Sequence, residues 1–261
     1  MSFLQINALK NTASLKDPEV SPAGPRATAA LSEEVAEKNR ELVDKHAEQL
    51  YHADAPTILE WAAEHAPGRL AVTLSMENTV LAELASRHLP ESDFLFLDTG
   101  YHFPETLEVA AAVDARYSQE LVTALPLLSR TDQDSVYGKN LYRNNPTACC
   151  RMRKMEPLAV SLSPYAGWIT GLRRADGPTR AQAPALSLDA TGRLKISPII
   201  TWSLEETNSF ITDNNLIDHP LTHRGYPSIG CETCTLPVAE GQDPRAGRWA
   251  GNAKTECGLH S

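Results

Sequence analysis

Near the start of the chain, apolar residues recur with the spacing of a helix. Six residues between positions 31 and 50 place their side chains on one helical face: Leu31, Val35, Leu42, Val43, His46 and Leu50. Ser32 can cap this helix at its beginning. A second helix is predicted after Asp54 and Pro56. We assign no chemistry to either segment.

Farther along, short apolar runs alternate with helical stretches. Strands are predicted at residues 70–74, 94–97, 121–124 and 168–171, and helices at 79–88, 104–116 and 147–160. This alternation is typical of an α/β fold with a mostly parallel sheet flanked by helices. Ligands of such sheets bind beyond the carboxyl ends of the strands. Residues 75–79 and 98–102 should therefore lie on the rim of one crevice.

The remaining pattern predicts a hairpin, one more helix and two tails. The hairpin joins residues 186–188 to 194–196, and the helix covers 203–214 with Ser203 as its cap. Prolines and a glycine punctuate residues 1–30, which read as a disordered tail. We expect a single α/β domain over residues 31–240 and a mobile C-terminal tail over residues 241–261.

Composition excludes several classes of protein. The formal net charge of -9 over 261 residues argues against a nucleic-acid binder, because the phosphate backbone attracts positive charge. No apolar run approaches the roughly 18–20 residues of a membrane span. The first residues lack the basic and apolar regions of a signal peptide, and five cysteines do not suggest a secreted disulfide scaffold. We therefore expect a cytoplasmic protein.

All five cysteines fall in three short stretches. Cys149 and Cys150 are adjacent, Cys231 and Cys234 form a Cys-x-x-Cys pair, and Cys257 lies near the C-terminus. The first four thiols could hold an iron–sulfur cluster or a structural zinc ion, or they could be unliganded. Neighbouring helical residues point about 100° apart, which suits two corners of a larger cluster better than one zinc ion. Spacing alone leaves the three alternatives open.

Cys257 is either a spare thiol or a nucleophile. Gly258 gives the backbone freedom, and His260 lies close by in the sequence. Nearby cations would favour the thiolate, which is the attacking form, whereas Glu256 would oppose it.

Several positions could bind an anionic substrate. Arg173 with Arg174, and Arg245 with Arg248, are candidate clamps because guanidinium binds phosphate or sulfate through paired hydrogen bonds. The alternative for each is a solvated surface residue. The loop that begins at Ser75 could present backbone N–H groups to a phosphate, although it lacks glycine and contains Glu77, which would repel the phosphate if it faced inward.

Six segments in one order resemble the assimilatory sulfonucleotide reductases, specifically the iron–sulfur type that reduces adenosine 5'-phosphosulfate (APS). The segments are residues 97–102, 149–154, 168–174, 225–234, 247–249 and 254–260. Their detailed sequence is closest to the actinobacterial members, and the resemblance covers about residues 65–260. One departure is the loop at residues 75–78, where many relatives carry a glycine and an aspartate.

The resemblance implies an adenine-nucleotide α-hydrolase-like (PP-loop-like) fold and a role in sulfate assimilation and cysteine biosynthesis. It implies one 4Fe–4S cluster on Cys149, Cys150, Cys231 and Cys234, a nucleophile at Cys257, and thioredoxin as the electron donor. Lys154 and His260 are expected to assist catalysis. The substrate-binding residues are then expected to be Ser75, Asp98, Arg173, Arg174, Arg245 and Arg248.

Three rival functions remain. The first is reduction of 3'-phosphoadenosine 5'-phosphosulfate (PAPS), or of both nucleotides, by the same chemistry. The second is a non-catalytic zinc-binding interaction module. The third is a PP-loop ATP pyrophosphatase, against which the absence of a Ser-Gly-Gly-x-Asp-like loop after Leu74 counts. A homo-oligomer is possible.

Overall fold

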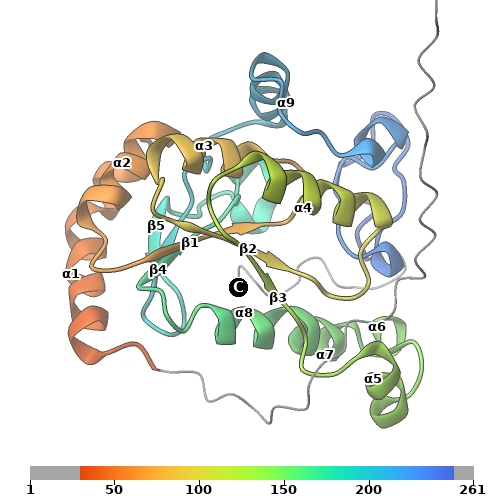
Figure 1. Cartoon of the computed structure of the whole chain (residues 1–261). Coiled ribbons are helices and arrows are strands. Elements are labelled where there is room, and N and C mark those ends of the chain that lie inside the picture. The colour runs from red at the N-terminus through yellow and green to blue at the C-terminus, as the bar shows by residue number, and fades with distance from the viewer. Residues whose placement is uncertain (1–29, 250–261) are drawn as a thin grey trace, which may run out of the picture.

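A six-stranded sheet forms the centre of the protein in the computed structural model, which describes residues 30–249 (Figure 1). The strands are β1 (Leu70–Leu74), β2 (Asp93–Leu97), β3 (Leu121–Ala124), β4 (Gly167–Ile169), β5 (Leu186–Leu188) and β6 (Leu194–Ile196). Their order is β3-β2-β1-β4-β6-β5, and only the pairing of β5 with β6 is antiparallel. The predicted α/β class and the terminal hairpin are confirmed.

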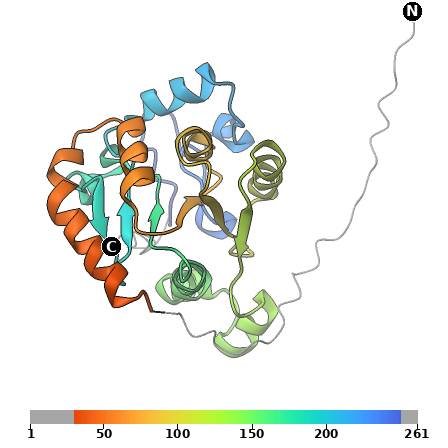
Figure 2. The ribbon, with the colours of Figure 1, turned by 60° about the vertical axis from the view of Figure 1, so that its left-hand side comes forward.

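Helices cover both faces of this sheet (Figure 2). On one face lie α2 (Ala55–His65), α3 (Val80–His88), α4 (Pro104–Arg116) and α9 (Leu204–Asp213), while α1 (Glu33–Leu50) packs along β5. On the other lie α5 (Arg130–Tyr137), α6 (Leu141–Asn144), α7 (Pro146–Cys150) and α8 (Glu156–Ser161). Successive strand residues face opposite layers, so Phe94 joins the large core and Leu95 the smaller core beneath α8.

Helix beginnings follow the capping residues predicted from sequence. The Ser32 side chain accepts a hydrogen bond from the Val35 backbone, and α1 begins one residue later. Ser203 and Glu206 form a reciprocal capping box at the start of α9. Local hydrogen bonding therefore sets these boundaries, and tertiary packing of the apolar face sets the rest.

The predicted helix over residues 147–160 is divided into three parts. A π-helical turn, Arg151–Met155, separates α7 from α8, and its last bond runs from the Glu156 N–H to the Arg151 carbonyl. Pro157 has no N–H to offer the Arg153 carbonyl, so a regular α-helical ladder cannot continue there. The wide turn changes the angular spacing between Cys150 and the residues that follow it.

The chain reverses direction across the sheet at β1. From β1 it proceeds to β2 and β3 on one side, and later to β4 and β6 on the other. The carboxyl ends of β1 and β4 therefore form the topological switch point where α/β proteins bind ligands.

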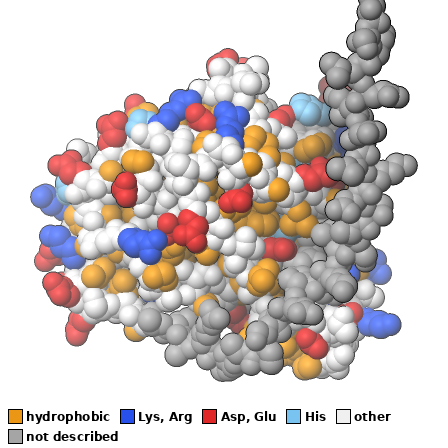
Figure 3. Space-filling model, in the orientation of Figure 1, with side chains coloured by type: hydrophobic (Ala, Val, Ile, Leu, Met, Phe, Trp, Pro, Cys, Tyr) orange, Lys and Arg blue, Asp and Glu red, His pale blue; other side chains and the backbone are white. Residues whose placement is uncertain are grey.

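Outside the sheet, two short 3₁₀ turns, Pro220–Arg224 and Glu232–Cys234, follow α9. Within residues 30–249, every helix is too short or too polar to cross a bilayer. Acidic and basic side chains are interspersed over the face in Figure 3. The predicted tails fall largely outside the described residues, which exclude 1–29 and 250–261.

Candidate active site

A cavity of about 250 Å³ opens at the switch point. Its walls come from the loops after β1, β2 and β4 and from residues 243–249. Ser75 and Glu77 follow β1, Thr99 and His102 follow β2, and Arg173 follows β4. The two rims expected from the strand ends therefore meet in one crevice, which we call the large cavity.

A smaller cavity, the thiol cavity, adjoins it. Cys149 and Cys150 of α7 line this cavity together with Cys231 and Cys234 of the last 3₁₀ turn. None of the four forms a disulfide within the described residues. The structure thus brings together two pairs of cysteines that lie about eighty residues apart in the sequence.

Burial affects whether these four thiols can ionise and act as metal ligands. Burial, reinforced by the charges of the other three cysteines, raises the pKa of the Cys149 thiol to about 12. A bound cation would be needed to hold such a group as thiolate at neutral pH. In the described part of the chain, no group of three or more His, Cys, Asp or Glu side chains is arranged to hold a metal ion. Four cysteine sulfurs around one cavity are nevertheless ligands of the kind that zinc and iron–sulfur groups both use.

The loop after β2 connects the two cavities. Arg153 donates from Nε to the Thr99 carbonyl oxygen at 2.6 Å, and its guanidinium lies 5.0 Å from the Tyr101 ring centre. The Thr99 hydroxyl accepts from the Tyr101 N–H and lies 3.4 Å from Cys231 Sγ, to which it can donate its own proton. The Glu232 N–H donates to the Tyr101 carbonyl at 2.8 Å. Thr99 therefore contacts a thiol while lining the large cavity.

Three side chains line both cavities: Lys154, Arg248 and Trp249. The Arg248 guanidinium lies 4.7 Å from the Trp249 ring centre and donates to the Ser228 hydroxyl at 3.1 Å. Gly230 makes this position possible, because a Cβ there would lie 2.4 Å from Arg248 Nη2. Two cations and an aromatic ring thus form a shared wall between the large cavity and the thiol cavity.

The segment that carries Arg248 is held on the thiol loop by backbone hydrogen bonds. The Leu236 N–H donates to the Gly247 carbonyl, and the Trp249 N–H donates to the Cys234 carbonyl, both at 2.9 Å. Arg245 lies one turn earlier and lines the large cavity. The first residues of the predicted C-terminal tail are therefore paired with the Cys-x-x-Cys loop.

The two arginines of the predicted clamp after β4 diverge. Arg173 lines the large cavity, whereas Arg174 donates to the Ala183 and Tyr51 carbonyls at 2.9 and 2.8 Å and lies 3.7 Å from the Tyr51 ring centre. Side chains of consecutive residues in extended backbone point to opposite sides, and Arg173 has that conformation. Arg173 therefore lies at the cavity, whereas the Arg174 guanidinium is directed to the backbone at Tyr51 and Ala183.

Asp98 and Ser75, also predicted to bind substrate, differ in position. Ser75 is exposed and lines the large cavity. Asp98 instead accepts a hydrogen bond from the Gly100 N–H at 2.8 Å, and Gly100 has a φ of +71°. Asp98 therefore stabilises the turn that presents Thr99 and is not among the residues that line either cavity in the described chain.

A matching family description decides the relationship to known proteins. The description "Phosphoadenosine phosphosulfate reductase domain" matches residues 69–237. The chain belongs to this family. The resemblance noted from the six sequence segments is thereby confirmed.

Named relatives of this reductase family are similar over nearly the whole chain. Adenosine 5'-phosphosulfate reductase of Mycolicibacterium smegmatis is 46% identical over 222 residues, which is 85% of this chain and 94% of the relative. The protein of the same name from Streptomyces coelicolor is 46% identical over 234 residues, covering 89% and 99%. Both are actinobacterial, as the sequence predicted.

Solved structures agree on the fold of the family. Phosphoadenylyl-sulfate (PAPS) reductase from Candida auris, in a phosphate complex, aligns with a TM-score of 0.62 at 26% identity, over 79% of this chain and 98% of that one. An FMN adenylyltransferase from Candida glabrata, in complex with FAD and pyrophosphate, aligns with a TM-score of 0.51 at 16% identity, over 85% and 86%. The second likeness concerns the fold alone.

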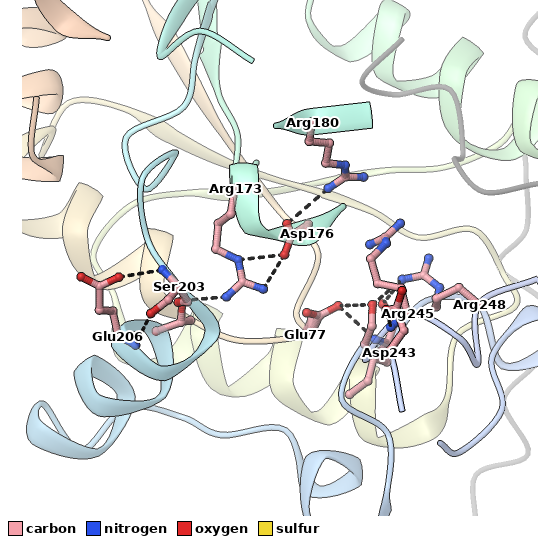
Figure 4. Close-up of polar contacts among 12 residues, drawn as sticks. Glu77, Arg173, Asp176, Arg180, Ser203, Glu206, Asp243, Arg245 and Arg248 are labelled. Atoms are coloured by element: carbon pink, nitrogen blue, oxygen red, sulfur yellow. Dashed lines mark hydrogen bonds and ion pairs between the residues drawn. The ribbon is translucent and has the colours of Figure 1, made fainter. Parts of the chain in front are cut away.

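Several residues of this reductase site were not recognised from sequence. Arg180 and Asp176 line the large cavity, and Asp176 forms ion pairs with both Arg173 and Arg180 (Figure 4). His102 also lines this cavity. Burial lowers the pKa of His102, whose Nε2 lies 2.8 Å from the Leu97 carbonyl. A neutral ring that donates from Nε2 leaves Nδ1 as an acceptor, and Nδ1 has no hydrogen-bond partner within residues 30–249.

Glu77 faces the loop that precedes Cys231. Its Oε2 accepts from the Ile229 N–H at 2.9 Å and from the Ser228 hydroxyl at 3.4 Å. The carboxylate that sequence suggested would repel a phosphate is therefore engaged by hydrogen-bond donors. The remaining predicted catalytic residues, Cys257 and His260, lie outside the described residues.

Proposed function

We propose that the protein reduces adenosine 5'-phosphosulfate to sulfite and AMP with electrons from thioredoxin. The observation that carries this proposal is the shared wall of Lys154, Arg248 and Trp249 between the large cavity and the thiol cavity. It suits a nucleotide whose anionic end must lie beside sulfur chemistry. The names of the relatives at 46% identity support APS as the substrate.

The nucleoside would occupy the large cavity, with its phosphosulfate directed to the shared wall. Lys154 and Arg248 supply positive charge there, and Arg245 lines the same cavity from the neighbouring turn. These cations would bind phosphate and sulfate oxygens and stabilise the negative charge that develops on the departing phosphate. His102 would offer its Nδ1 as an acceptor to a hydroxyl or amino group of the nucleoside.

We further propose that Cys149, Cys150, Cys231 and Cys234 hold a 4Fe–4S cluster. The four cysteine thiols around one cavity, together with Lys154 and Arg248 as nearby cations, provide the ligands and the charge compensation that such a group requires. When bound, the cluster supplies structural order and local charge next to the sulfate. The Thr99 hydroxyl would donate to the Cys231 sulfur and orient that ligand.

Cys257 is the proposed nucleophile. It follows Trp249 by eight residues, and eight extended residues span at most about 28 Å. Since Trp249 lines both cavities, this tether is long enough for the thiol to reach the phosphosulfate. The thiolate would form a bond to the sulfate sulfur while the sulfur–oxygen bond to phosphate breaks, which releases AMP and leaves S-sulfocysteine. His260, three residues farther on, is proposed to assist.

Thioredoxin would complete the reaction. One of its thiolates attacks the Cys257 sulfur and displaces sulfite, forming a mixed disulfide, and its second thiol resolves that disulfide and regenerates the Cys257 thiol. The two electrons that reduce the sulfur come from the thioredoxin dithiol, which becomes a disulfide. The tail would close for the first step and open for the second.

The test is the intact mass of the anaerobically purified protein after incubation with APS, and separately with PAPS, without thioredoxin. We expect a sulfonate adduct from APS that is absent in Cys257→Ser, with iron and acid-labile sulfide near four per chain in both proteins. Equal labelling by PAPS would indicate a dual-specificity reductase. No adduct on protein with its full iron content, or stoichiometric zinc in place of iron, would contradict the proposal.

A further inference from the structure

Charged side chains of both signs line the large cavity. Among the described residues, five cationic side chains line it, namely Lys154, Arg173, Arg180, Arg245 and Arg248. Three anionic side chains also line it: Glu77, Asp176 and Asp243. A site that needed only to attract an anion would gain nothing from the carboxylates, so their placement calls for an explanation.

Asp176 is bound to two of the arginines at once (Figure 4). Its Oδ1 accepts from Arg173 Nε and Nη2 at 3.0 and 2.7 Å, and its Oδ2 lies 3.3 Å from Arg180 Nη1. The side chains of Arg173, Asp176 and Arg180 are only 11%, 14% and 9% exposed. Water therefore screens these charges weakly, and the carboxylate strongly reduces the positive potential of both arginines.

The neighbouring helix fixes Arg173 in this arrangement. Its Nη1 donates to the Thr207 hydroxyl at 2.7 Å, and that hydroxyl donates in turn to the Ser203 carbonyl at the start of α9 at 2.8 Å. The guanidinium thus gives two of its donors, Nε and Nη2, to one Asp176 oxygen, and these donors could otherwise bind a phosphate. Asp176 occupies the place of an anion.

Within the described chain, this ion-paired group lines the large cavity alone. Arg173, Asp176 and Arg180 line the large cavity but are not among the described residues that line the thiol cavity, whereas Lys154 and Arg248 line both. If the phosphosulfate lies against the shared wall, the nucleoside extends away from that wall into the cavity that Asp176 lines. This step rests on the proposed function.

APS and PAPS differ only at the ribose 3' position, which bears a hydroxyl in one and a phosphate in the other. A phosphomonoester carries about −1.5 to −2 charges at neutral pH, and burying it requires matched cations. We propose that Asp176 is a specificity-determining residue: it occupies the donors of Arg173 and Arg180 and repels a 3'-phosphate, so that the site selects nucleotides with a free 3'-hydroxyl.

The test uses two unreactive nucleotides, AMP and adenosine 3',5'-bisphosphate, which differ by that one phosphate. Their affinities for the anaerobically purified full-length protein are measured by calorimetry at constant salt, so that neither turnover nor thioredoxin is needed. The wild-type protein should bind AMP at least tenfold more tightly than the bisphosphate. In Asp176→Asn, which keeps the shape and an acceptor oxygen but removes the charge, this preference should fall at least tenfold.

Asp243→Asn is the matched control. Asp243 lines the same cavity, and its replacement by Asn changes the charge by the same amount. The hydrogen bond that the structure records for its carboxylate is to the Arg245 N–H rather than to the buried arginines. We expect its preference for AMP to change less than threefold. Asp176→Ser, with its folding checked by iron content and circular dichroism, serves as a second variant and should reproduce the shift.

Three results would overturn the inference. Equal affinities of the wild-type protein for AMP and for the bisphosphate would overturn it, and no variant is needed for that result. A shift in Asp176→Asn no larger than in Asp243→Asn, or parallel loss of both affinities, would make the role of Asp176 structural. Each of these leaves the proposed reduction of APS standing, whereas failure of the wild-type protein to bind either nucleotide would remove the proposed substrate site together with this inference.

Discussion

Glu77 connects the loop after β1 to the loop that leads into Cys231, and its removal should loosen the second loop. The Ile229 N–H that donates to Glu77 belongs to a residue that is only 4% exposed. A hydrogen bond to a charged acceptor contributes about 1.5–3 kcal/mol, and an unsatisfied buried donor costs about 1–3 kcal/mol. These two figures describe the same bond and are not added. We therefore expect Glu77→Ala to lower the free energy of opening this loop by about 2 kcal/mol.

A change of about 2 kcal/mol corresponds to roughly a 30-fold increase in the population of the open loop. Hydrogen exchange of the Ile229 amide, followed by mass spectrometry on anaerobic protein, measures that population directly. Glu77→Gln retains an acceptor oxygen without the charge and should give a smaller increase than Glu77→Ala.

The control is Glu105→Ala, which breaks the more exposed ion pair of Glu105 with Arg224 in the preceding segment. Such pairs contribute about 0–1 kcal/mol, so exchange at Ile229 should stay within about threefold of wild type. Unchanged exchange in Glu77→Ala, or equal acceleration in both alanine variants, would refute the reasoning that Glu77 holds this loop.

Two further predictions concern catalysis and pH. Lys154→Ala should lower turnover about 100-fold, as loss of one stabilising group does in other active sites, with iron retained; a wild-type rate would exclude the role. Burial lowers the pKa of His219, whose Nδ1 accepts from the Leu221 N–H. The unfolded chain therefore binds a proton below about pH 6.5 that the folded protein does not, and the free energy of unfolding should fall there by up to about 1.4 kcal/mol per pH unit. Urea unfolding at pH 7.5 and 5.5 should show this loss reduced in His219→Asn but not in His223→Asn, which alters an exposed ring; equal losses in wild type and His219→Asn would contradict it.

The sheet and the outline of the site were predictable because local signals are strong there. Apolar runs of strand length end at polar residues such as Ser75 and Asp98, and parallel strands bring those ends to one edge. Cap residues such as Ser32 and Ser203 mark helix beginnings through hydrogen bonds that span only three residues.

The inner surface of the cavity could not be predicted, because it depends on contacts that leave no periodic signal. Whether Arg173 or Arg174 faces the ligand depends on the pleat of extended backbone. Asp176 and Arg180 lie in two consecutive 3₁₀ turns around a glycine and a proline. The contact of Glu77 with Ile229 spans 152 positions of sequence, and no sequence pattern near either residue predicts it.

The pairing of residues 247–249 with the Cys-x-x-Cys loop also bears on how the protein is made. Translation proceeds from the N-terminus, so the sheet, the first thiol pair and the loop at 231–234 leave the ribosome before Arg248 and Trp249. The wall that separates nucleotide from thiols can therefore close only on a loop that already exists. Cys257 is synthesised after every described residue that lines the two cavities. A nascent chain thus receives its proposed nucleophile after the residues that would surround it have already been made.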